Sequence, residues 1–209
     1  MHNKKPLSEQ SPCLAGMEHI KRFWDGASQT WTAKILPGEY YVTQEGEGIA
    51  TVLGSCISAC IRDPKRKIGG MNHFMLPANE ADNTVGIATR YGNFAMEHLI
   101  NEILKYGGQK ERLEVKVFGG GQVIQDMNTM NIGNRNIEFV DEYCRTENIN
   151  VLSHDVGDIY PRKVLYFPET GLVRVKKLKT LHNDTLKQRE ERYFQQINTE
   201  PQVSDIELF

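Results

Sequence analysis

The feature that most constrains the fold is a pair of apolar segments within residues 51–77, joined by the turn sequence Asp-Pro-Lys-Arg. Two such segments on either side of a short turn predict a β-hairpin. If Arg62 pairs with Lys67 across the turn, Cys56 in the first arm lies directly opposite His73 in the second. Opposed side chains have Cβ atoms about 4.5–5.5 Å apart, so an imidazole there can take a thiol proton. The hairpin therefore predicts a Cys-His nucleophilic pair.

Three alternatives stay open at this point. A β-bulge at Gly69 and Gly70 would shift the register and move His73 away from Cys56. The Gly-Ser-Cys triplet could be only a strand-end bend with a buried thiol. A lone strand histidine is often a structural residue with satisfied hydrogen bonds.

Several residues around the pair are candidates for binding the substrate or an oxyanion. Gly54 and Ser55 supply a bend that would present Cys56, with backbone N–H groups free to bind an oxyanion. A triple glycine after a predicted strand lacks the sequence context of a phosphate-binding loop, and its close backbone approach suits a wall or an oxyanion donor beside Cys56. The candidate substrate and oxyanion residues are Gly54, Ser55, Asn72, Gly119 and Gly120.

Composition describes an ordinary globular chain. Its 209 residues are 39% hydrophobic and 25% charged, with a formal net charge of −2. The charge gives no reason to expect nucleic acid or an anionic membrane as a partner, and no apolar run approaches the roughly 18 residues of a membrane span. The first 30 residues lack a signal-peptide core, so we expect a cytoplasmic protein. We expect one domain at residues 37–179, an N-terminal extension at 1–36 and a loosely attached polar tail at 180–209.

The four cysteines do not show the spacing of a metal site. Cys56 and Cys60 lie four residues apart with His73 in reach, which would suit zinc. A structural zinc site normally has a fourth protein ligand, and no C-x-x-C or H-x-x-x-H partner occurs. We therefore predict no metal and no other cofactor, and we interpret Cys144 as a packing residue on a helix.

Hydrophobic periodicity predicts the order of the elements. Helical spacing of apolar residues indicates two helices, and alternating or short apolar runs indicate strands around them. The predicted helices are residues 86–106 and 134–147; the predicted strands are 39–43, 49–53, 113–117, 149–153, 163–167 and 172–175. Strands, helix, strand, helix, strands in this order predict a single α/β (α+β) layered sandwich of mixed sheets and helices, not a doubly wound nucleotide-binding fold.

Six short motifs follow one another over roughly residues 38–176: Leu53-Gly-Ser-Cys56, Asp63-Pro64, Gly70-Met-Asn-His73, Met75-Leu-Pro77, Phe118-Gly-Gly-Gly121 and Asn131-Ile-Gly-Asn-Arg-Asn136. Taken together, they resemble the CheD family of chemoreceptor glutamine deamidases. The resemblance implies a fold like that of the toxin deamidases and a cytoplasmic enzyme of bacterial chemotaxis. Such an enzyme hydrolyses selected glutamines of methyl-accepting chemotaxis receptors to glutamate and ammonia. A CheC-type phosphatase regulates some members, and some also hydrolyse receptor methyl esters.

The same resemblance implies roles for individual residues. Cys56 is the nucleophile and His73 the general base. The family's third catalytic residue is a Thr six residues before the Cys, where this chain has Ala50. Alternation sends neighbouring strand side chains to opposite faces, so we expect Thr51 to orient His73 only if the backbone twists or bulges.

Two rival functions stay open. A cysteine hydrolase of another kind, such as a peptidase, would use the same pair on another bond. A non-enzymatic adaptor would instead use the basic segment with Lys176 and Lys177 to hold a receptor or a phosphatase. The substitution at Ala50 is the feature that favours the adaptor.

Overall fold

Strand β5 (Ile57–Asp63) lies at the centre of the fold and is buried on both faces. Its side chains alternate between two cores, as a strand dictates. Ile57, Ala59 and Ile61 belong to a core shared with helices, and Cys60 belongs to a second core between two sheets. Cys56, just before the strand, joins the second core. The computed structural model describes residues 10–77, 85–123, 132–179 and 184–199.

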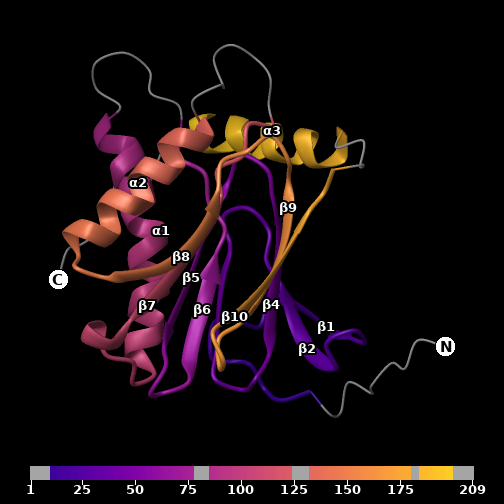
Figure 1. The fold of residues 1–209 in the computed structure, drawn as a ribbon, viewed down its shortest axis with the longest axis vertical. Helices are drawn as coiled ribbons and strands as arrows, with labels where there is room; N and C mark the ends of the chain where they lie inside the picture. Colours follow the sequence, from indigo (N-terminus) through magenta and orange to yellow (C-terminus); the bar gives the residue numbers. More distant parts are fainter. Residues whose placement is uncertain (1–9, 78–84, 124–131, 180–183, 200–209) are drawn as a thin grey trace.

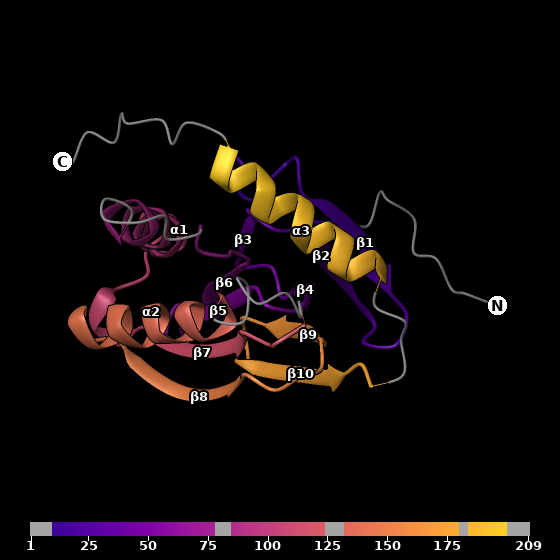
Figure 2. The same ribbon diagram turned by 90° about the horizontal axis from the view of Figure 1, so that it is seen from above.

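The two cores separate three layers. One five-stranded sheet has the order β1-β2-β4-β9-β10 and the other β3-β6-β5-β7-β8. Helices α1 and α2 cover the outer face of the second sheet, and α3 lies across the ends of the strands (Figure 1). From above, α1 and α2 lie together to one side, apart from α3 (Figure 2). The predicted layered α+β sandwich is confirmed.

The elements, in chain order, are β1 (Lys21–Asp25), β2 (Thr30–Lys34), β3 (Tyr40–Thr43), β4 (Gly48–Leu53), β5 (Ile57–Asp63), β6 (Ile68–Asn72), α1 (Val85–Lys105), the short 3-10 helix η2 (Lys110–Arg112), β7 (Glu114–Gly119), α2 (Ile132–Thr146), β8 (Asn150–Val156), β9 (Arg162–Phe167), β10 (Leu172–Lys177) and α3 (Asp184–Thr199). Both predicted helices and the predicted strands match elements of this set to within a few residues. The polar residues 78–85, which we expect to form a loop before the first helix, fall mostly outside the described residues.

The predicted hairpin register is wrong by two residues. Asp63, not Arg62, closes the turn by pairing with Ile68. The Asp63 carboxylate accepts hydrogen bonds from the N–H groups of Lys65 and Arg66, at 2.9 and 3.1 Å, and Lys67 adopts a left-handed backbone conformation with φ 55°. A side chain that bonds its own turn in this way stabilises the observed connection, which has four residues like the predicted one but is displaced by one residue.

The corrected register still brings the two candidate catalytic residues together. An isolated bridge between Ile57 and Phe74 continues the pairing beyond the strands without a shift at the glycines of β6. In this register Cys56 faces Met75, and His73 is its diagonal neighbour on the same face. The opposition predicted for the pair is therefore a diagonal contact.

The segment at residues 1–36 is not an extension outside the core where the structure describes it. Strand β2 pairs in parallel with β4, and β1 pairs with β2 at the edge of the same sheet. Ala33 and Ile35 are fully or almost fully buried. Parallel pairing between segments far apart in sequence leaves no local signal, because neither strand shows its partner.

The segment after residue 179 is not a loosely attached tail where the structure describes it. Helix α3 buries Leu186, Glu190 and Ile197 against the body of the protein. Within residues 10–77, 85–123, 132–179 and 184–199, no helix is long and apolar enough to cross a membrane.

Candidate active site

Cys56 lies in the bend between β4 and β5, and its side chain is fully buried. Two hydrogen bonds from the triple glycine fix the bend. Gly120 donates its N–H to the carbonyl of Cys56, and Gly121 donates its N–H to the carbonyl of Gly54, each at 2.7 Å. Gly119 has φ 114°, and a Cβ there would lie 2.2 Å from the Cys56 carbonyl oxygen. Only glycine permits this close approach. The triple glycine therefore holds the backbone of the nucleophile candidate.

His73 follows directly after β6 and is fully buried. Its Nδ1 lies 2.7 Å from the hydroxyl oxygen of Thr51, and that hydroxyl donates its only proton to the carbonyl of Ile35 at 2.9 Å. The hydroxyl can then only accept from the ring, so Nδ1 carries the proton of the neutral imidazole. Nε2 is left with its lone pair and has no hydrogen-bond partner among the described residues. This is the tautomer that a base needs.

Thr51 reaches His73 by regular strand alternation. Strand β4 pairs with β9 in an unbroken register, with Thr51 opposite Val164. Ile49 and Leu53 lie in the core between the sheets, and Thr51, on the same face, points the same way. No bulge is needed, so that part of the expectation is wrong. Ala50, one residue earlier, lies on the other face of the strand.

A side chain that was not among the candidates completes the site. The Glu190 carboxylate of α3 accepts backbone hydrogen bonds from Gly54 and Ser55, each at 2.8 Å, and a longer one from Cys56 at 3.4 Å. The Ser55 hydroxyl donates to it at 2.7 Å. Glu190 is fully buried. The N–H groups of the bend, which we expected to bind an oxyanion, thus converge on one position, and the Glu190 carboxylate accepts their hydrogen bonds there.

Burial and charge keep both members of the pair neutral in this arrangement. Burial raises the pKa of the Cys56 thiol well above its usual value, and the adjacent Glu190 carboxylate raises it further. Burial lowers the pKa of His73 to about 3, and the positive charge of Arg189 adds to the decrease. The neutral thiol and neutral imidazole are the resting pair from which a proton transfer would start.

Cys56, His73 and Glu190 also form a possible set of metal ligands. One sulfur, one ring nitrogen and one carboxylate oxygen all lie within 4.8 Å of one another. Zinc can take such donors, with a fourth position left for water. Both carboxylate oxygens already accept hydrogen bonds from the bend at Gly54 and Ser55. These bonds account for the orientation of Glu190.

Two predicted substrate or oxyanion residues have other partners. Asn72 accepts from the N–H of Ala59 at 2.8 Å and donates to the carbonyl of Ala95 at 3.0 Å, so it links β5 to α1. Gly120 has its N–H bonded to Cys56 and cannot offer it to an oxyanion. Among the predicted donors, Gly54 and Ser55 face the occupied position.

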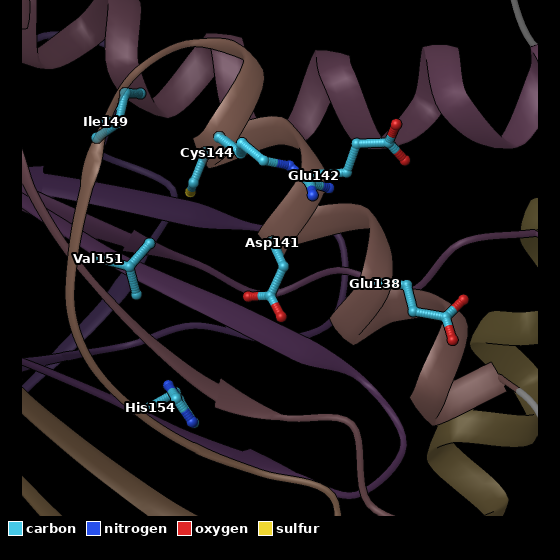
Figure 3. A pocket seen from close by; sticks show the side chains of 8 residues that line it. Glu138, Asp141, Glu142, Cys144, Ile149, Val151 and His154 are labelled. Atoms are coloured by element: carbon cyan, nitrogen blue, oxygen red, sulfur yellow. The ribbon is translucent and has the colours of Figure 1, made fainter.

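A hollow of about 700 Å³ lies away from Cys56, between α2 and β8 (Figure 3). Its lining includes neither Cys56 nor His73. The one nucleophilic side chain in it is Cys144, which packs in the helix-side core as predicted. Burial raises the pKa of that thiol to about 12. The hollow is lined by Glu138, Asp141, Glu142, Cys144, Arg145, Ile149, Val151 and His154.

Comparison with known proteins places this chain in a family. The probable chemoreceptor glutamine deamidase CheD of Halorhodospira halophila is 51% identical, over 94% of this chain and 93% of its own length. The protein of the same name from Hahella chejuensis is 50% identical, over 99% of this chain and 98% of its own. The chain belongs to the CheD family. The CheD of Methylobacillus flagellatus is 52% identical over 90% of this chain and 94% of its own.

The family model for CheD chemotactic sensory transduction matches residues 75–177. That range begins after Cys56 and His73, whereas the matches to the CheD relatives cover nearly the whole chain. Among solved structures, the Neisseria meningitidis protein NMB0706 overlaps 57% of this chain and 53% of its own, with a TM-score of 0.37 and 8% identity. At this low similarity, the overlap supports no inference about the function of this chain.

Sequence reasoning missed Glu190, although one signal for it exists. In α3 the residues on the buried side recur at helical spacing, with a glutamate in the middle of an otherwise apolar stripe. A charged residue in such a stripe is unusual unless it has partners. The stripe consists of Leu186, Glu190, Tyr193, Phe194 and Ile197.

Proposed function

We propose that this CheD-family chain is a chemoreceptor glutamine deamidase with a cysteine nucleophile. The observation that carries the proposal is the position of His73. Its Nδ1–H is taken up by Thr51, its Nε2 is unpaired among the described residues, and a ring nitrogen lies within 4.8 Å of the Cys56 sulfur. Backbone N–H groups of the bend converge beside the same sulfur. A base, a nucleophile and oxyanion donors are the parts that acyl transfer needs.

The reaction then follows the chemistry of these groups. His73 takes the thiol proton through Nε2, and the Cys56 sulfur attacks the carboxamide carbon of a glutamine side chain. The N–H groups of Gly54 and Ser55 stabilise the negative charge on the carboxamide oxygen. The imidazolium protonates the leaving nitrogen, ammonia departs, and a thioester remains. Water, deprotonated by His73, hydrolyses the thioester to glutamate and restores the thiol.

Thr51 has a supporting role in this scheme. When His73 gains the second proton, its ring must stay in place to pass the proton to the leaving group. The fixed Thr51 oxygen keeps accepting from Nδ1–H in both protonation states. The scheme requires neither a metal nor a cofactor.

The proposed partners follow from the substrate. The chain acts on methyl-accepting chemotaxis receptors, replacing a neutral amide with a carboxylate and so changing repulsion along a receptor segment. We place this activity in the cytoplasm, with regulation by a CheC-type phosphatase as a further proposal. Of the two lysines that the adaptor alternative uses, Lys177 already forms an ion pair with Asp158 at 2.9 Å.

Intact-mass spectrometry of a purified receptor cytoplasmic fragment tests the proposal. Wild-type protein is expected to add about 1 Da per modified site without shortening the chain, because an amide becomes an acid. Cys56→Ala and His73→Ala are expected to abolish the gain. Shorter fragments would indicate a peptidase instead. Binding without any mass change would favour the adaptor and overturn the proposal.

A further inference from the structure

The active site described above is filled by the protein's own C-terminal helix. Glu190 accepts hydrogen bonds from three consecutive backbone N–H groups, those of Gly54, Ser55 and Cys56. An oxyanion or a carboxylate product would use the same donors. A carboxylate oxygen also lies within 4.8 Å of both the Cys56 sulfur and a ring nitrogen of His73. The Glu190 carboxylate therefore lies in the position that the carboxamide of a substrate must take.

The chemical identity of this side chain matters. Hydrolysis of a glutamine side chain produces a glutamate side chain, and Glu190 is a glutamate attached to a helix. Its carboxylate therefore occupies the site as the product of the proposed reaction would. Glu190 accepts from every N–H of the bend and from the Ser55 hydroxyl, so these donors are all in use while α3 is in place.

The rest of α3 fits its surroundings along about three turns. Leu186 and Ile197 are buried on either side of Glu190. Tyr193 packs against Gly38, where a Cβ would lie 3.3 Å from the ring, and its hydroxyl hydrogen-bonds that of Tyr91. The surface beneath α3 is thus shaped for an amphipathic helix whose apolar stripe is interrupted by one glutamine-sized side chain.

A polar contact at the edge of the stripe ties α3 to the end of β4. Arg189, next to Glu190, donates to the carbonyl of Val52 at the end of β4 at 2.8 Å. This bond satisfies a strand carbonyl next to the nucleophile bend. A substrate helix with a donor one residue before its glutamine could make the same bond.

We propose that α3 is an intramolecular product mimic that occupies the substrate groove, and that the substrate binds there as an amphipathic helix with its glutamine in the position of Glu190. This inference rests on the proposed function and specifies its substrate. Apolar residues four before, three and four after, and seven after the glutamine match Leu186, Tyr193, Phe194 and Ile197. Departure of α3 opens the site.

The closed arrangement is inactive for three physical reasons. The oxyanion donors are already used, and the carboxylate beside Cys56 opposes formation of a thiolate. The thiol is also inaccessible, since Cys56 is fully buried. Displacement of α3 removes all three obstacles at once.

The decisive experiment changes the mimic into a substrate. In a Glu190→Gln variant, the carboxamide lies against the nucleophile of its own chain. The Cys56 sulfur is expected to attack the carboxamide carbon and expel ammonia, leaving either a thioester with a loss of about 17 Da or, after hydrolysis by water, a glutamate with a gain of about 1 Da over the amide. Peptide mapping of the purified full-length variant over time assigns the change to position 190.

The controls use the same helix. A Cys56→Ala, Glu190→Gln double variant is expected to keep its amide. Glu191→Gln places an amide one residue away on a side chain that is 37% exposed, and it is expected to stay unchanged. The native Gln188 serves as an internal control in every sample. If the Glu190→Gln variant folds with an intact Cys56 and keeps its amide at position 190, the inference is overturned.

A second variant provides a readout that does not depend on conversion at position 190. Glu190→Ala is expected to increase iodoacetamide labelling of Cys56 at least about tenfold and to raise kcat/KM on a receptor fragment, because the groove is freed for longer. Glu191→Ala is expected to match the wild type in both assays. Loss of receptor deamidation in Glu190→Ala would make Glu190 a catalytic residue and overturn the inference.

Comparing the two assays separates this inference from the proposed function. Receptor deamidation by wild type, without conversion of the amide in Glu190→Gln, retains the function and rejects the mimic. Conversion of that amide without receptor deamidation retains the mimic and the site chemistry but rejects the receptor as substrate. Failure of both rejects both.

Discussion

The Thr51 hydroxyl and Nδ1 of His73 lie 2.7 Å apart, and they come from different sheets. Thr51 is on β4 of one sheet, and His73 follows β6 of the other. The contact crosses the core between the sheets, and the carbonyl of Ile35 fixes the hydroxyl from a third segment. The orientation of the proposed base therefore depends on how the two sheets pack.

Replacing Thr51 with Val tests that dependence. Val has nearly the same shape and lacks the hydroxyl, so both the Ile35 carbonyl and Nδ1–H of His73 lose a partner. We expect kcat to fall at least about tenfold, within the roughly 10⁴-fold that general-base catalysis contributes, with little change in KM. The free energy of unfolding should fall by about 1–3 kcal/mol. Steady-state deamidation kinetics and urea unfolding measure the two effects.

Two matched variants sharpen this test. Thr51→Ser keeps the hydroxyl and should retain most of the activity. Ala50→Thr added to Thr51→Val puts a threonine six residues before Cys56 but places its hydroxyl on the opposite face of β4, so it should rescue nothing. Rescue by Ala50→Thr would contradict the strand alternation described here.

The buried His73 should make stability depend on pH. Its pKa in the folded protein is about 3, below the ordinary 6.5, so below pH 6.5 the unfolded chain binds a proton that the folded chain does not. This contribution to the free energy of unfolding is complete above pH 6.5 and is lost as pH falls toward 3, at up to about 1.4 kcal/mol per pH unit. Urea unfolding between pH 7 and pH 5 measures the slope.

A His73→Gln variant is the control for this slope. It lacks the titrating ring, and the other histidines contribute equally in both proteins. The variant should therefore lose less stability than the wild type between pH 6.5 and pH 5, whatever its absolute stability. Equal slopes would mean that His73 takes up its proton over the same pH range in the folded and the unfolded protein.

Asp63 closes the β5–β6 turn and ties it to the loop after α1. Burial would raise the pKa of its carboxyl, but hydrogen bonds from Arg112 and from nearby backbone N–H groups lower it to about 2. Asp63→Asn removes the charge opposite the Arg112 guanidinium and leaves some of these donors unsatisfied. We expect a loss of about 1–3 kcal/mol in the free energy of unfolding, with an unchanged denaturant m-value.

The contrast with Lys67 provides the control for Asp63. Lys67 pairs with Glu169 at 3.2 Å, but its side chain is 65% exposed. Exposed pairs contribute little, so Glu169→Gln should change stability by less than about 1 kcal/mol. A similar loss in both variants would show that burial does not decide the strength of these pairs.

Chelation separates thiol chemistry from metal chemistry at Cys56, His73 and Glu190. The proposed mechanism uses the sulfur and the imidazole directly, so extended dialysis against EDTA should leave receptor deamidation unchanged. Elemental analysis of the same samples should give less than about 0.1 zinc per chain, since each donor already has a role in hydrogen bonding or proton transfer. Stoichiometric zinc with loss of activity on its removal would contradict the thiol scheme.

Local patterns predicted much of the fold, and long-range contacts explain what they missed. The helix expected at 86–106 is α1 (Val85–Lys105), because its apolar spacing is a local signal. The proximity of Cys56 and His73 was predicted although the register was wrong by two residues. The error came from Lys67, whose left-handed conformation the sequence does not suggest, since glycine or asparagine usually takes that position.

The role of α3 could not be predicted because its partner lies more than 130 residues earlier. A polar segment around residues 188–192 looks like a solvated tail until its docking surface is known. The role of Glu190 depends on its contact with Gly54 and Ser55, whose N–H groups bond its carboxylate across 136 and 135 residues of sequence. The parallel pairing of β2 with β4 was hidden for the same reason.

Covalent attachment of α3 sets the kinetic terms on which a substrate competes for the site. Few residues separate the end of β10 at Lys177 from Asp184, so the helix faces its groove at an effective concentration in about the millimolar range, and diluting the protein does not lower it. A free substrate helix displaces α3 only if its concentration exceeds that value or if its affinity for the groove is higher than that of α3. The rate of turnover would then rise with the local density of the substrate receptor and stay low on receptors that are far from one another.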